Sequence, residues 1–396
     1  MTNREIIELS DQTQVGVYAR YPVAFVRGRG ARLWDADGRE YLDFFTGLAV
    51  NNLGHGHPRV VAAIREQSER LLHASNVYYN EPAARLGKLL TEHSFADRVF
   101  FCNSGAEANE AAIKIARKYG AENLEGRYEI LTTFGSFHGR TIATLSATAQ
   151  EKYQAGFHPM LPGFRYVPFG DVAAMADAVR EQTLGILVEP IQGEGGVNVP
   201  PEGYLRRLRE LCDERRLLLL LDEVQVGMGR TGSLFAHEHE GIRPDIVSLA
   251  KALGGGLPIG AMLTTNEIAR SYTTGAHGST FGGNPLACAA GAAVVMALLE
   301  EHVLENCREM GRRIRERLER LRGALPMIRE VRGRGLILGA ELDRNGRPFV
   351  GAALEQGLVI NCTAERVIRL LPPLTITAGE VDEGMAILEK VLRAAA

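Results

Sequence analysis

The fold class of this chain is decided by nine residues, Leu217-Leu218-Leu219-Leu220-Leu221-Asp222-Glu223-Val224-Gln225. Five consecutive leucines present no polar face, which is typical of a strand buried on both sides of a parallel sheet. Two carboxylates follow at the carboxyl end of that strand. In open sheets that carry helices on both faces, ligands bind at this end of the strands. The nine residues therefore predict a buried central strand and the edge where a ligand binds.

Similar strand patterns flank the leucines and alternate with helical patterns. We expect further strands over 98–102, 128–133, 183–189, 245–249 and 259–264. The residues between them predict a helix over 105–119, closed by Gly120, and an amphipathic helix over 202–215. This alternation predicts an α/β fold with a mostly parallel central sheet flanked by helices.

The pattern changes where long helices begin, after residue 284. Expected there are helices over 286–300, 303–321 and 379–394, a strand over 336–342 and a turn at Asn345-Gly346. We expect a large domain over 61–284 and a smaller α+β domain over 285–396. Residues 1–60 are expected to join the smaller domain, because 31–45 is typical of a short hairpin around Asp37-Gly38.

Composition and charge exclude several classes of protein. The chain has 396 residues, of which 45% are hydrophobic and 23% charged, as in globular proteins of two or three domains. It holds 45 basic and 48 acidic residues, for a net charge of −3, with no basic run, so we expect no nucleic-acid partner. The longest uncharged helical stretch, 287–299, is too short to span a membrane.

Cysteine usage indicates the compartment. The five cysteines are scattered, without the spacing of metal or redox sites, at positions 102, 212, 288, 307 and 362. This is typical of reduced thiols in a cytosol. The first residues lack the apolar core of a signal peptide. We therefore expect a cytoplasmic protein without a membrane segment.

A lone lysine stands at a second strand end. The apolar run 245–250 stops at Lys251, and small residues follow as far as Gly256. Burial lowers the pKa of a lysine, so that its neutral amine can attack a carbonyl carbon. Taken alone, the pattern fits a surface lysine better, and only the motifs elsewhere in the chain favour the reactive amine.

The start of the helix expected at residue 105 has the features of an anion site. Ser104 and Glu107 have the spacing of a capping box. Free N–H groups and the helix dipole favour an anion there, and Gly105 and Ala106 leave space for a phosphate. A well-capped helix without a ligand explains this motif equally well.

Aromatic, basic and acidic residues follow two other strands. Phe137 and His138 could stack on a planar ligand, and Arg140 offers a fork for a carboxylate. Asp222, at the end of the leucine strand, needs a cationic partner because a buried lone carboxylate is costly. A protonated pyridine nitrogen is one candidate.

Two other signals are weak. Residues 227–232, Gly-Met-Gly-Arg-Thr-Gly, match the dinucleotide fingerprint and follow a strand, but no apolar-periodic helix comes after them, so we reject the match. The histidine pairs in 55–57 and 237–239 have no further residues at ligand spacing, so we expect no metal site.

An anion-binding helix start, a stacking ring, a buried Asp and an amine-bearing Lys are the parts needed to hold pyridoxal 5′-phosphate. In this combination the chain resembles the class III (ω-amino acid) aminotransferases of the fold type I pyridoxal-phosphate enzymes. The resemblance extends from Tyr18 to Leu374. It rests on the motifs at 100–110, 137–141, 189–196, 222–225, Lys251 and 277–285.

The resemblance implies a role for each matching residue. Lys251 would bind the cofactor covalently and carry the proton during the reaction, and Asp222 would keep the pyridine nitrogen protonated. Gln225 would reach the phenolic oxygen. The other cofactor contacts would come from Ser104, Gly105, Ala106, Phe137, His138, Val224 and Thr280. Thr280, with Ser279 beside it, would reach the site from a neighbouring subunit, which implies a homodimer.

The resemblance also implies the substrates, because the chain is most similar to family members that act on N2-acetyl-L-ornithine. The terminal amino group would pass to 2-oxoglutarate, giving N-acetyl-L-glutamate 5-semialdehyde and L-glutamate in a step of arginine biosynthesis. Arg140 would hold the carboxylate far from the reacting amine, and Arg369 the α-carboxylate of glutamate. Glu194 would mask Arg369 when no second carboxylate is bound. A purely structural ion pair of Glu194 and Arg369 would look the same in sequence.

Two positions vary informatively from related patterns. Ornithine aminotransferases carry a tyrosine where this chain has Leu48, and leucine cannot pair with a free α-ammonium group but can contact an acetyl methyl group. Plain core filling by Leu48 is the alternative. Where the pattern has threonine after the Asp-Glu-Val-Gln motif, this chain has Val226, which puts only a minor polar contact in doubt.

Other functions remain open at this point. Ornithine, 4-aminobutyrate and succinyldiaminopimelate aminotransferases share the pattern. A glutamate-1-semialdehyde aminomutase would share the fold but would not need the Arg369 and Glu194 pair. A regulator that only binds pyridoxal phosphate would need a DNA-binding extension, and the sequence indicates none.

Overall fold

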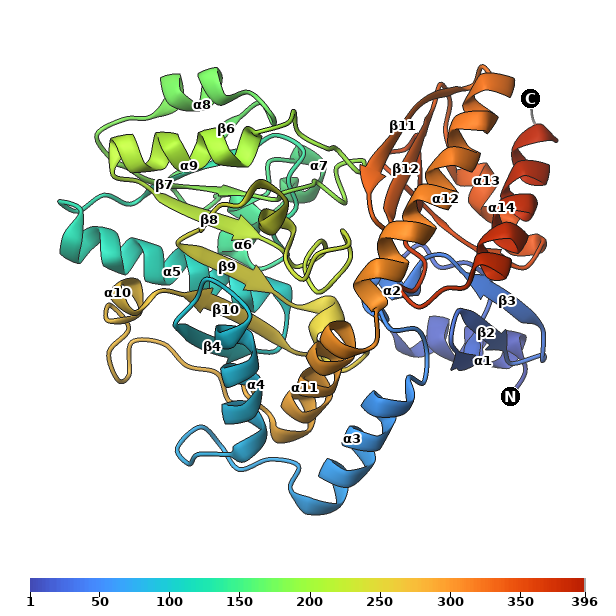
Figure 1. Ribbon diagram of the computed structural model, residues 1–396, viewed down its shortest axis with the longest axis horizontal. Coiled ribbons are helices and arrows are strands. Elements are labelled where there is room, and N and C mark those ends of the chain that lie inside the picture. The colour runs from blue at the N-terminus through green and yellow to red at the C-terminus, as the bar shows by residue number, and fades with distance from the viewer. Residues whose placement is uncertain (395–396) are drawn as a thin grey trace.

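The leucine run forms strand β8 (Leu218–Asp222) in the middle of a seven-stranded sheet of order β4-β10-β9-β8-β7-β5-β6. This computed structural model describes residues 1–394. The last two residues of the expected C-terminal domain, 395–396, lie outside the described part. Figure 1 shows the sheet in one part of the molecule, with the C-terminal helices and strands beside it.

The remaining strands of this sheet are β4 (Arg98–Cys102), β5 (Glu129–Thr133), β6 (Phe164–Val167), β7 (Thr183–Val188), β9 (Ile246–Leu249) and β10 (Gly260–Thr264). Strand β10 pairs antiparallel with β4 and β9, whereas the other neighbouring strands pair in parallel. The predicted α/β fold with a mostly parallel sheet is confirmed. The edge strand β6 was not predicted.

Alternate leucines of β8 face opposite sides of the sheet. Leu218 and Leu220 are buried in one cluster with residues of helix α5 (Gly105–Asn123). Leu219 and Leu221 are buried in another cluster with residues of helix α9 (Tyr204–Arg215). Successive side chains of a strand point to opposite faces, so α5 and α9 pack on opposite faces of β8. This explains why the strand carries no polar residue before Asp222.

Helix α5 continues beyond Gly120 to Asn123, so the prediction that Gly120 closes it is wrong. Gly120 is buried. A Cβ atom there would overlap the Arg127 carbonyl oxygen and lie 2.7 Å from Leu184 Cδ1. The glycine thus allows the helix to approach neighbouring backbone, and its carbonyl oxygen accepts hydrogen bonds from the N–H groups of Leu124 and Gly126 at the helix end.

Two four-stranded sheets lie outside the central one. Strands β1 (Phe25–Arg29), β2 (Arg32–Asp35) and β3 (Glu40–Asp43) form one sheet with β13 (Leu358–Val359). The other sheet contains β11 (Ile328–Arg334), β12 (Ile337–Leu342), β15 (Val367–Leu370) and β14 (Asn361–Thr363). The hairpin expected over 31–45 is formed by β2 and β3. Because β3 pairs with β13, the N-terminal strands share a sheet with C-terminal residues.

The turn predicted at Asn345-Gly346 does not form a hairpin. These residues lead into helix α13 (Arg347–Glu355), and Asn345 Oδ1 accepts a hydrogen bond from the Arg347 N–H at 2.9 Å. The hairpin in this region instead joins β11 to β12 around Gly335, whose φ is 55°. An Asn-Gly pair therefore served here to start a helix.

Helix α11 (Pro285–Glu300) packs against helices α3 (Pro58–Arg70) and α4 (Glu81–Glu92). It continues across a 70° bend into α12 (Val303–Ala324), which packs against α14 (Ala378–Arg393). In residues 1–394 no single helix is long and apolar enough to cross a membrane, although α11 and α12 meet that test as a bent pair. The domain limits at residues 60 and 284 stay a prediction.

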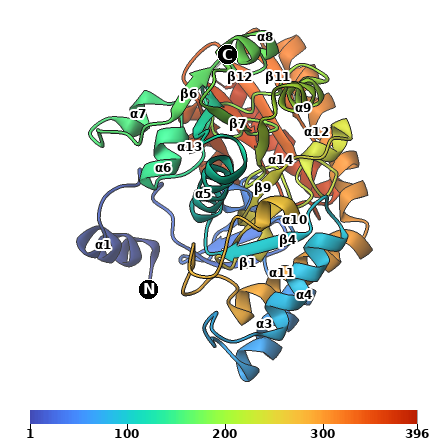
Figure 2. The same cartoon turned by 90° about the vertical axis from the view of Figure 1, so that its left-hand side faces the viewer.

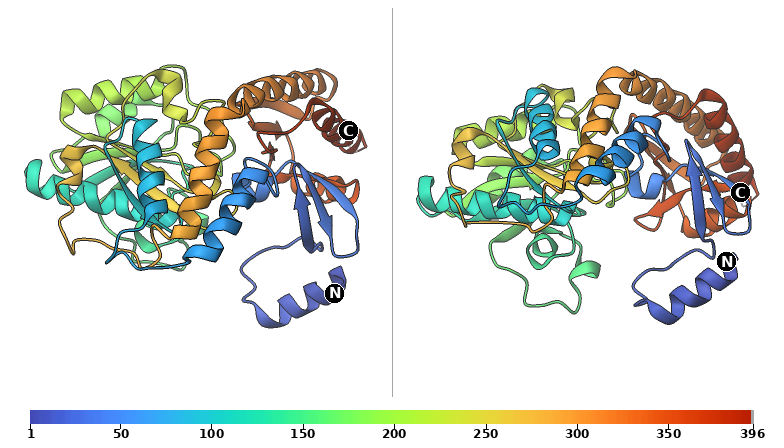
Figure 3. Two further views of the ribbon diagram at one scale, coloured as in Figure 1. Left: turned by 60° about the horizontal axis from the view of Figure 1, so that its bottom comes forward. Right: turned by 90° about the horizontal axis from the view of Figure 1, so that it is seen from below.

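The remaining helices are short or peripheral. They are α1 (Asn3–Thr13), α2 (Thr46–Ala49), α6 (Ile142–Ala147), α7 (Glu151–Gln154), α8 (Val172–Ala178), α10 (Asn266–Ala269) and the 3₁₀ helices η1 (Ala236–Glu240) and η2 (Lys251–Gly254). Figures 2 and 3 show α1 standing away from the rest of the molecule. No residue of α1 is buried.

Candidate active site

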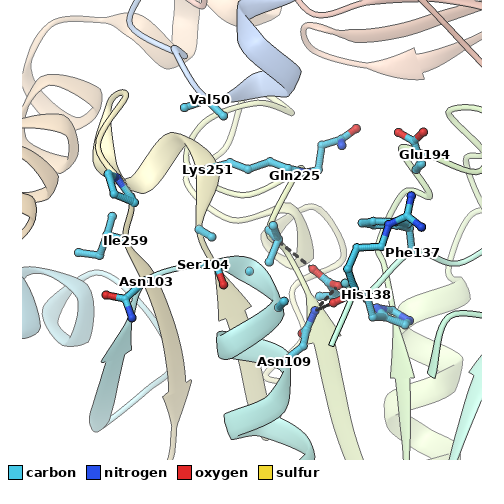
Figure 4. A pocket seen from close by; sticks show the side chains of 18 of the residues that line it. Val50, Asn103, Ser104, Asn109, Phe137, His138, Glu194, Gln225, Lys251 and Ile259 are labelled. Atoms are coloured by element: carbon cyan, nitrogen blue, oxygen red, sulfur yellow. Dashed lines mark hydrogen bonds and ion pairs between the residues drawn. The ribbon is translucent and has the colours of Figure 1, made fainter. Parts of the chain in front are cut away.

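The carboxyl ends of the central strands surround a cavity of about 440 Å³ (Figure 4). Eleven of the predicted site residues line it: Ser104, Gly105, Ala106, Phe137, His138, Arg140, Glu194, Asp222, Val224, Gln225 and Lys251. Leu48, Ser279, Thr280 and Arg369 do not line it. Most of the predicted site residues therefore lie around one cavity, and their contacts indicate what each residue can do there.

Lys251 enters the cavity from the end of β9, at the first residue of η2. Its φ is 44°, a left-handed conformation that costs a non-glycine residue about 1–3 kcal/mol. Burial lowers the pKa of its ammonium group, while the nearby Asp222 raises it. The net shift is downward, which favours a neutral amine that can act as a nucleophile.

Asp222 is buried at the end of β8 and is held by three donors. Its Oδ2 accepts hydrogen bonds from Asn109 Nδ2 at 2.7 Å and from His138 Nδ1 at 2.8 Å. Its Oδ1 accepts one from the Val224 N–H at 3.0 Å. A carboxylate oxygen can accept more than one hydrogen bond. Oδ1 can therefore accept a second hydrogen bond, from an N–H group of a ligand in the cavity.

His138 is fixed by its surroundings rather than aimed at the cavity with a free nitrogen. Its Nε2 lies 3.2 Å from Thr132 Oγ1, and its N–H donates to Thr148 Oγ1 at 2.9 Å. Asn109, which the sequence did not single out, also donates to the His138 carbonyl oxygen at 2.8 Å. Asn109 and His138 together therefore orient the Asp222 carboxylate by binding its Oδ2 atom.

The first turn of α5 presents its backbone to the cavity. Ser104 caps the helix by accepting a hydrogen bond from the Glu107 N–H. The capping box is only half formed, because Glu107 accepts from the Asn103 N–H at 2.6 Å instead of from Ser104. N–H groups in a first helical turn have no partner within the helix, so Gly105 and Ala106 can bind an anion.

Gly105 is required by a close approach. A Cβ atom there would lie 2.6 Å from Val224 Cγ1. The glycine lets Val224, which follows Asp222, reach the wall of the cavity beside the start of α5. Phe137 lines the same cavity, so an aliphatic and an aromatic side chain are both available to contact a planar ring.

Glu189, at the end of β7, was not predicted as a site residue, although it lies within one of the recognised motifs. It is buried, lines the cavity and accepts a hydrogen bond from the Phe137 N–H at 3.0 Å. Burial and the neighbouring Asp222 raise its pKa well above the ordinary value. A protonated carboxyl here would be a donor as well as an acceptor.

Arg369 lies behind the cavity wall on β15 and is completely buried. It donates to Glu194 Oε2 at 3.2 Å, to Gln225 Oε1 at 3.2 Å and to the Gly193 carbonyl oxygen at 3.0 Å. Asn361 Oδ1 accepts from its Nε and Nη2. Burial lowers its pKa, and the contact with Glu194 raises it.

Arg140 is exposed, and within residues 1–394 it forms no ion pair or hydrogen bond. Its guanidinium lies 4.1 Å from the centre of the Tyr153 ring and 5.5 Å from that of Phe137. A cation held by aromatic faces keeps its hydrogen-bond donors free for a carboxylate. Tyr153 was not predicted.

Leu48 lies on a strained turn two residues before Val50, which lines the cavity. Four consecutive residues, 46–49, have φ between 48° and 68°, although left-handed backbone costs about 1–2 kcal/mol for each non-glycine residue. The turn is held by Asp43 Oδ1, which accepts from the backbone N–H of Phe45 and Thr46. Leu48 is 39% exposed, and the cavity wall itself contains Val50.

The rejected glycine-rich match supports this turn. Arg230, within 227–232, is fully buried and donates to Asn52 Oδ1 and to the carbonyl oxygens of Leu336 and Pro372. It thus joins three distant segments. Val226, just before, is buried in an apolar cluster with Val197 and Ile337, which suits valine at the position where threonine was expected.

The residues expected from a neighbouring subunit lie near one edge of the site. Ser279 Oγ accepts a hydrogen bond from Asn103 Nδ2 at 3.2 Å in the same chain. Thr280 is exposed. Within residues 1–394 there is no group of three or more His, Cys, Asp or Glu side chains able to hold a metal ion.

The donors and acceptors of the cavity fit pyridoxal 5′-phosphate. The helix start suits the phosphate, the Asp222 carboxylate a protonated ring nitrogen, and the Lys251 amine an aldehyde. Asn109 Oδ1 and Ser248 Oγ are buried polar atoms without a partner in the described chain, so this region is not a fully satisfied core.

The model of the aminotransferase class-III family matches residues 15–392. The chain belongs to this family. Class-III aminotransferases depend on pyridoxal phosphate, in agreement with the chemistry of the cavity.

The relatives are similar over almost their whole length. The acetylornithine aminotransferase of Methanocaldococcus jannaschii is 49% identical over 393 residues, covering 99% of this chain and 98% of the relative. That of Gloeobacter violaceus is 51% identical over 384 residues and 96% of both chains. A structure of the Toxoplasma gondii ornithine aminotransferase, described as having partial occupancy of pyridoxal phosphate, superposes with a TM-score of 0.96 at 38% identity, over 99% of this chain and 94% of the other.

Proposed function

We propose that this class-III aminotransferase moves the terminal amino group of N2-acetyl-L-ornithine to 2-oxoglutarate. The products are N-acetyl-L-glutamate 5-semialdehyde and L-glutamate, in a step of arginine biosynthesis. The observation that carries the proposal is a difference in ion pairing between two arginines. Arg140 has no anionic partner in residues 1–394, whereas Arg369 forms an ion pair with Glu194. One substrate has a single carboxylate and the other has two, so the site needs one permanent and one optional carboxylate contact. The names of the similar curated enzymes support the same substrate.

Bound pyridoxal phosphate supplies an aldehyde that takes up the amino group and a ring that withdraws the electron pair left on the substrate carbon when its proton is removed. The protein would hold it with the N–H groups of Gly105 and Ala106, with Phe137 and Val224 against the ring, and with Gln225. Asp222, oriented by Asn109 and His138, would hold the proton on the ring nitrogen. The Lys251 amine would anchor the cofactor and then move the proton from the amine-bearing carbon of the substrate.

The substrate would be oriented by the two arginines. Arg140 would bind the α-carboxylate of N2-acetylornithine, far from the reacting terminal amine, while Glu194 keeps Arg369 neutralised. When glutamate or 2-oxoglutarate binds, Arg140 would take the distal carboxylate and Arg369 the α-carboxylate, displacing Glu194. Leaving the buried Arg369 unpaired would be costly, which gives the exchange a physical reason.

We infer that the working unit is a cytoplasmic homodimer. Exposed apolar side chains gather in 71–79 and at Phe281, and Asn76 Nδ2 joins these segments by donating to the carbonyl oxygens of Ser279 and Gly282. An exposed apolar surface of this kind favours burial against a second copy. Ser279 and Thr280 would then contribute to the partner's site. All five cysteines are free thiols, as expected in a reducing compartment.

Ornithine is the second candidate donor, because the superposed Toxoplasma gondii structure is an ornithine aminotransferase. Leu48 favours the acetylated donor, since it offers no hydrogen bond to a free α-ammonium group. An assay of N2-acetylornithine, ornithine, 4-aminobutyrate and succinyldiaminopimelate with 2-oxoglutarate tests the proposal. The expected result is the highest kcat/KM for N2-acetylornithine. Equal use of ornithine, or turnover without 2-oxoglutarate, would contradict it.

A further inference from the structure

Tyr153 lies on the short helix α7, which is tied to the loop that carries Phe137 and Arg140. Gln150 Nε2, just before the helix, donates to the carbonyl oxygens of Gly135 and Ser136 at 3.3 and 2.9 Å. Gln154, the last residue of α7, is buried and donates to the Thr148 carbonyl oxygen at 2.9 Å and to Tyr166 Oη at 3.0 Å. Tyr153 is therefore held between two anchored glutamines.

The ring of Tyr153 contacts the two functional side chains of that loop. Its centre lies 5.6 Å from the centre of the Phe137 ring, at an interplanar angle of 82°. The Arg140 guanidinium lies 4.1 Å from the Tyr153 centre, closer than its 5.5 Å from Phe137. Edge-to-face aromatic pairs and cation–π contacts are both favourable at these separations.

Arg140 has nothing else to hold it in the described chain. No carboxylate or carbonyl oxygen within residues 1–394 accepts a hydrogen bond from it. A long exposed side chain loses rotamer entropy when it is fixed. Without the aromatic contacts, Arg140 would lose this entropy when a substrate binds.

We propose that Tyr153 is a positioning residue that holds the Arg140 guanidinium ready for the substrate carboxylate. The inference rests on the proposed role of Arg140. It assigns the selectivity for carboxylate-bearing donors to the Tyr153 ring as well as to the charge of Arg140. The hydroxyl group contributes little, because no hydrogen bond of Tyr153 Oη is found within residues 1–394.

A ligand with two carboxylates would also involve the second carboxylate contact, Arg369. Burial lowers the pKa of Arg369, and Glu194 and then Tyr153 oppose that shift. One carboxylate of such a ligand would still bind at Arg140, which the Tyr153 ring contacts. Binding of such a ligand should depend on Tyr153 even when no reaction takes place.

The test compares Tyr153→Leu, which removes the ring, with Tyr153→Phe, which keeps it. Phe157→Leu is the matched control, because Phe157 is an exposed ring in the same segment and does not line the cavity. The dissociation constant of glutarate is measured by calorimetry on the cofactor-loaded dimer. KM and kcat are measured for N2-acetylornithine and for N-acetyl-1,4-diaminobutane, which has the same amine but no carboxylate.

Tyr153→Leu should weaken glutarate binding and raise KM for N2-acetylornithine by roughly 3- to 30-fold, the effect of one cation–π contact. Turnover of N-acetyl-1,4-diaminobutane should be unchanged. Tyr153→Phe and Phe157→Leu should stay within about twofold of the parent. In an Arg140→Ala background, Tyr153→Leu should add nothing.

The proposal is overturned if Tyr153→Phe is as impaired as Tyr153→Leu, since the hydroxyl would then be the active part. It is also overturned if the donor without a carboxylate is affected equally, which would indicate a general structural role. Unchanged glutarate binding in Tyr153→Leu would have the same consequence. If N2-acetylornithine is not a substrate, the glutarate measurement still decides the role of Tyr153.

Discussion

Arg140 and Arg369 belong to the same site but are held in opposite ways. Arg140 is exposed, rests against two aromatic rings and has no anionic partner in the described chain. Arg369 is fully buried and donates to Glu194, Gln225, Asn361 and a backbone carbonyl group. Arg140 can bind a substrate carboxylate at once, whereas at Arg369 the substrate carboxylate must first displace that of Glu194.

This difference explains how one cavity can serve two substrates. Arg140 would be the permanent contact. By holding the carboxylate of the amino donor, it would fix where the reacting amine lies. An optional contact needs a charge that can leave, and Glu194 at 3.2 Å is the mobile candidate because it is partly exposed. The hydrogen bonds that Arg369 donates to Asn361 and to the Gly193 carbonyl oxygen would keep it in place during the exchange.

The largest effect is expected from a substitution that removes the reactive amine and leaves both arginines in place. Lys251→Ala should lower the rate by at least ~10² to 10⁴ through loss of proton transfer, and by more through loss of the covalent anchor. Both half-reactions should be lost together, while pyridoxal phosphate still binds through its other contacts. Stopped-flow absorbance of the bound cofactor measures both.

Lys390→Ala is the matched control, because Lys390 lies on α14, does not line the cavity, and its ammonium group donates a hydrogen bond to Gln356 Oε1 at 2.8 Å. It should behave like the parent. Normal multiple turnover by Lys251→Ala would contradict the assignment of the reactive amine.

The next effect concerns the choice between two amino donors. Leu48→Tyr should narrow or reverse the preference for N2-acetylornithine over ornithine by about ten- to a hundredfold, because the phenol can pair with the free ammonium group. The ratio of the two kcat/KM values measures it. Leu48→Phe adds the ring without the hydroxyl and should leave the order of preference unchanged. If both variants change the ratio alike, Leu48 acts only by size.

A smaller effect is expected from removing the anionic partner of Arg369, which would leave both arginines without an ion pair. Glu194→Ala should uncover Arg369, so the half-reaction with glutamate should gain roughly tenfold relative to that with N2-acetylornithine, as for one charge-assisted hydrogen bond. Single-turnover rates with each donor give the ratio. Glu194→Gln, which keeps the shape without the charge, should lie between. An equal fall for both donors would make Glu194 a structural residue.

The parts of the site that the sequence predicted are those in which local order sets the position. Asp222 ends one buried strand and Lys251 lies two residues after another, so the strand pattern places them at the binding edge. The helix start at Ser104 is similarly local. The family resemblance then implied Glu194 and Arg369, which lie 175 residues apart in sequence and contact each other.

The parts that were missed depend on contacts between distant segments. Asn109 orients Asp222 from the second turn of a helix, and Asn361 holds Arg369 across a strand pair. Tyr153 gave no sequence signal because one tyrosine in a polar segment has no periodicity. Gly120 and Asn345-Gly346 were misread because the same residues serve turns, close packing and helix starts.

The exchange at Arg369 is tested most directly by the half-reactions of Arg369→Lys, which keeps the charge but loses the bidentate fork. Thermal unfolding of the variant is measured alongside, because Arg369 is buried. The expected result is a KM for glutamate and 2-oxoglutarate raised by at least about tenfold, the effect of one lost charge-assisted hydrogen bond. The half-reaction with N2-acetylornithine should change by less than about threefold. Equal losses in both half-reactions of a folded variant would contradict the division of roles between Arg140 and Arg369.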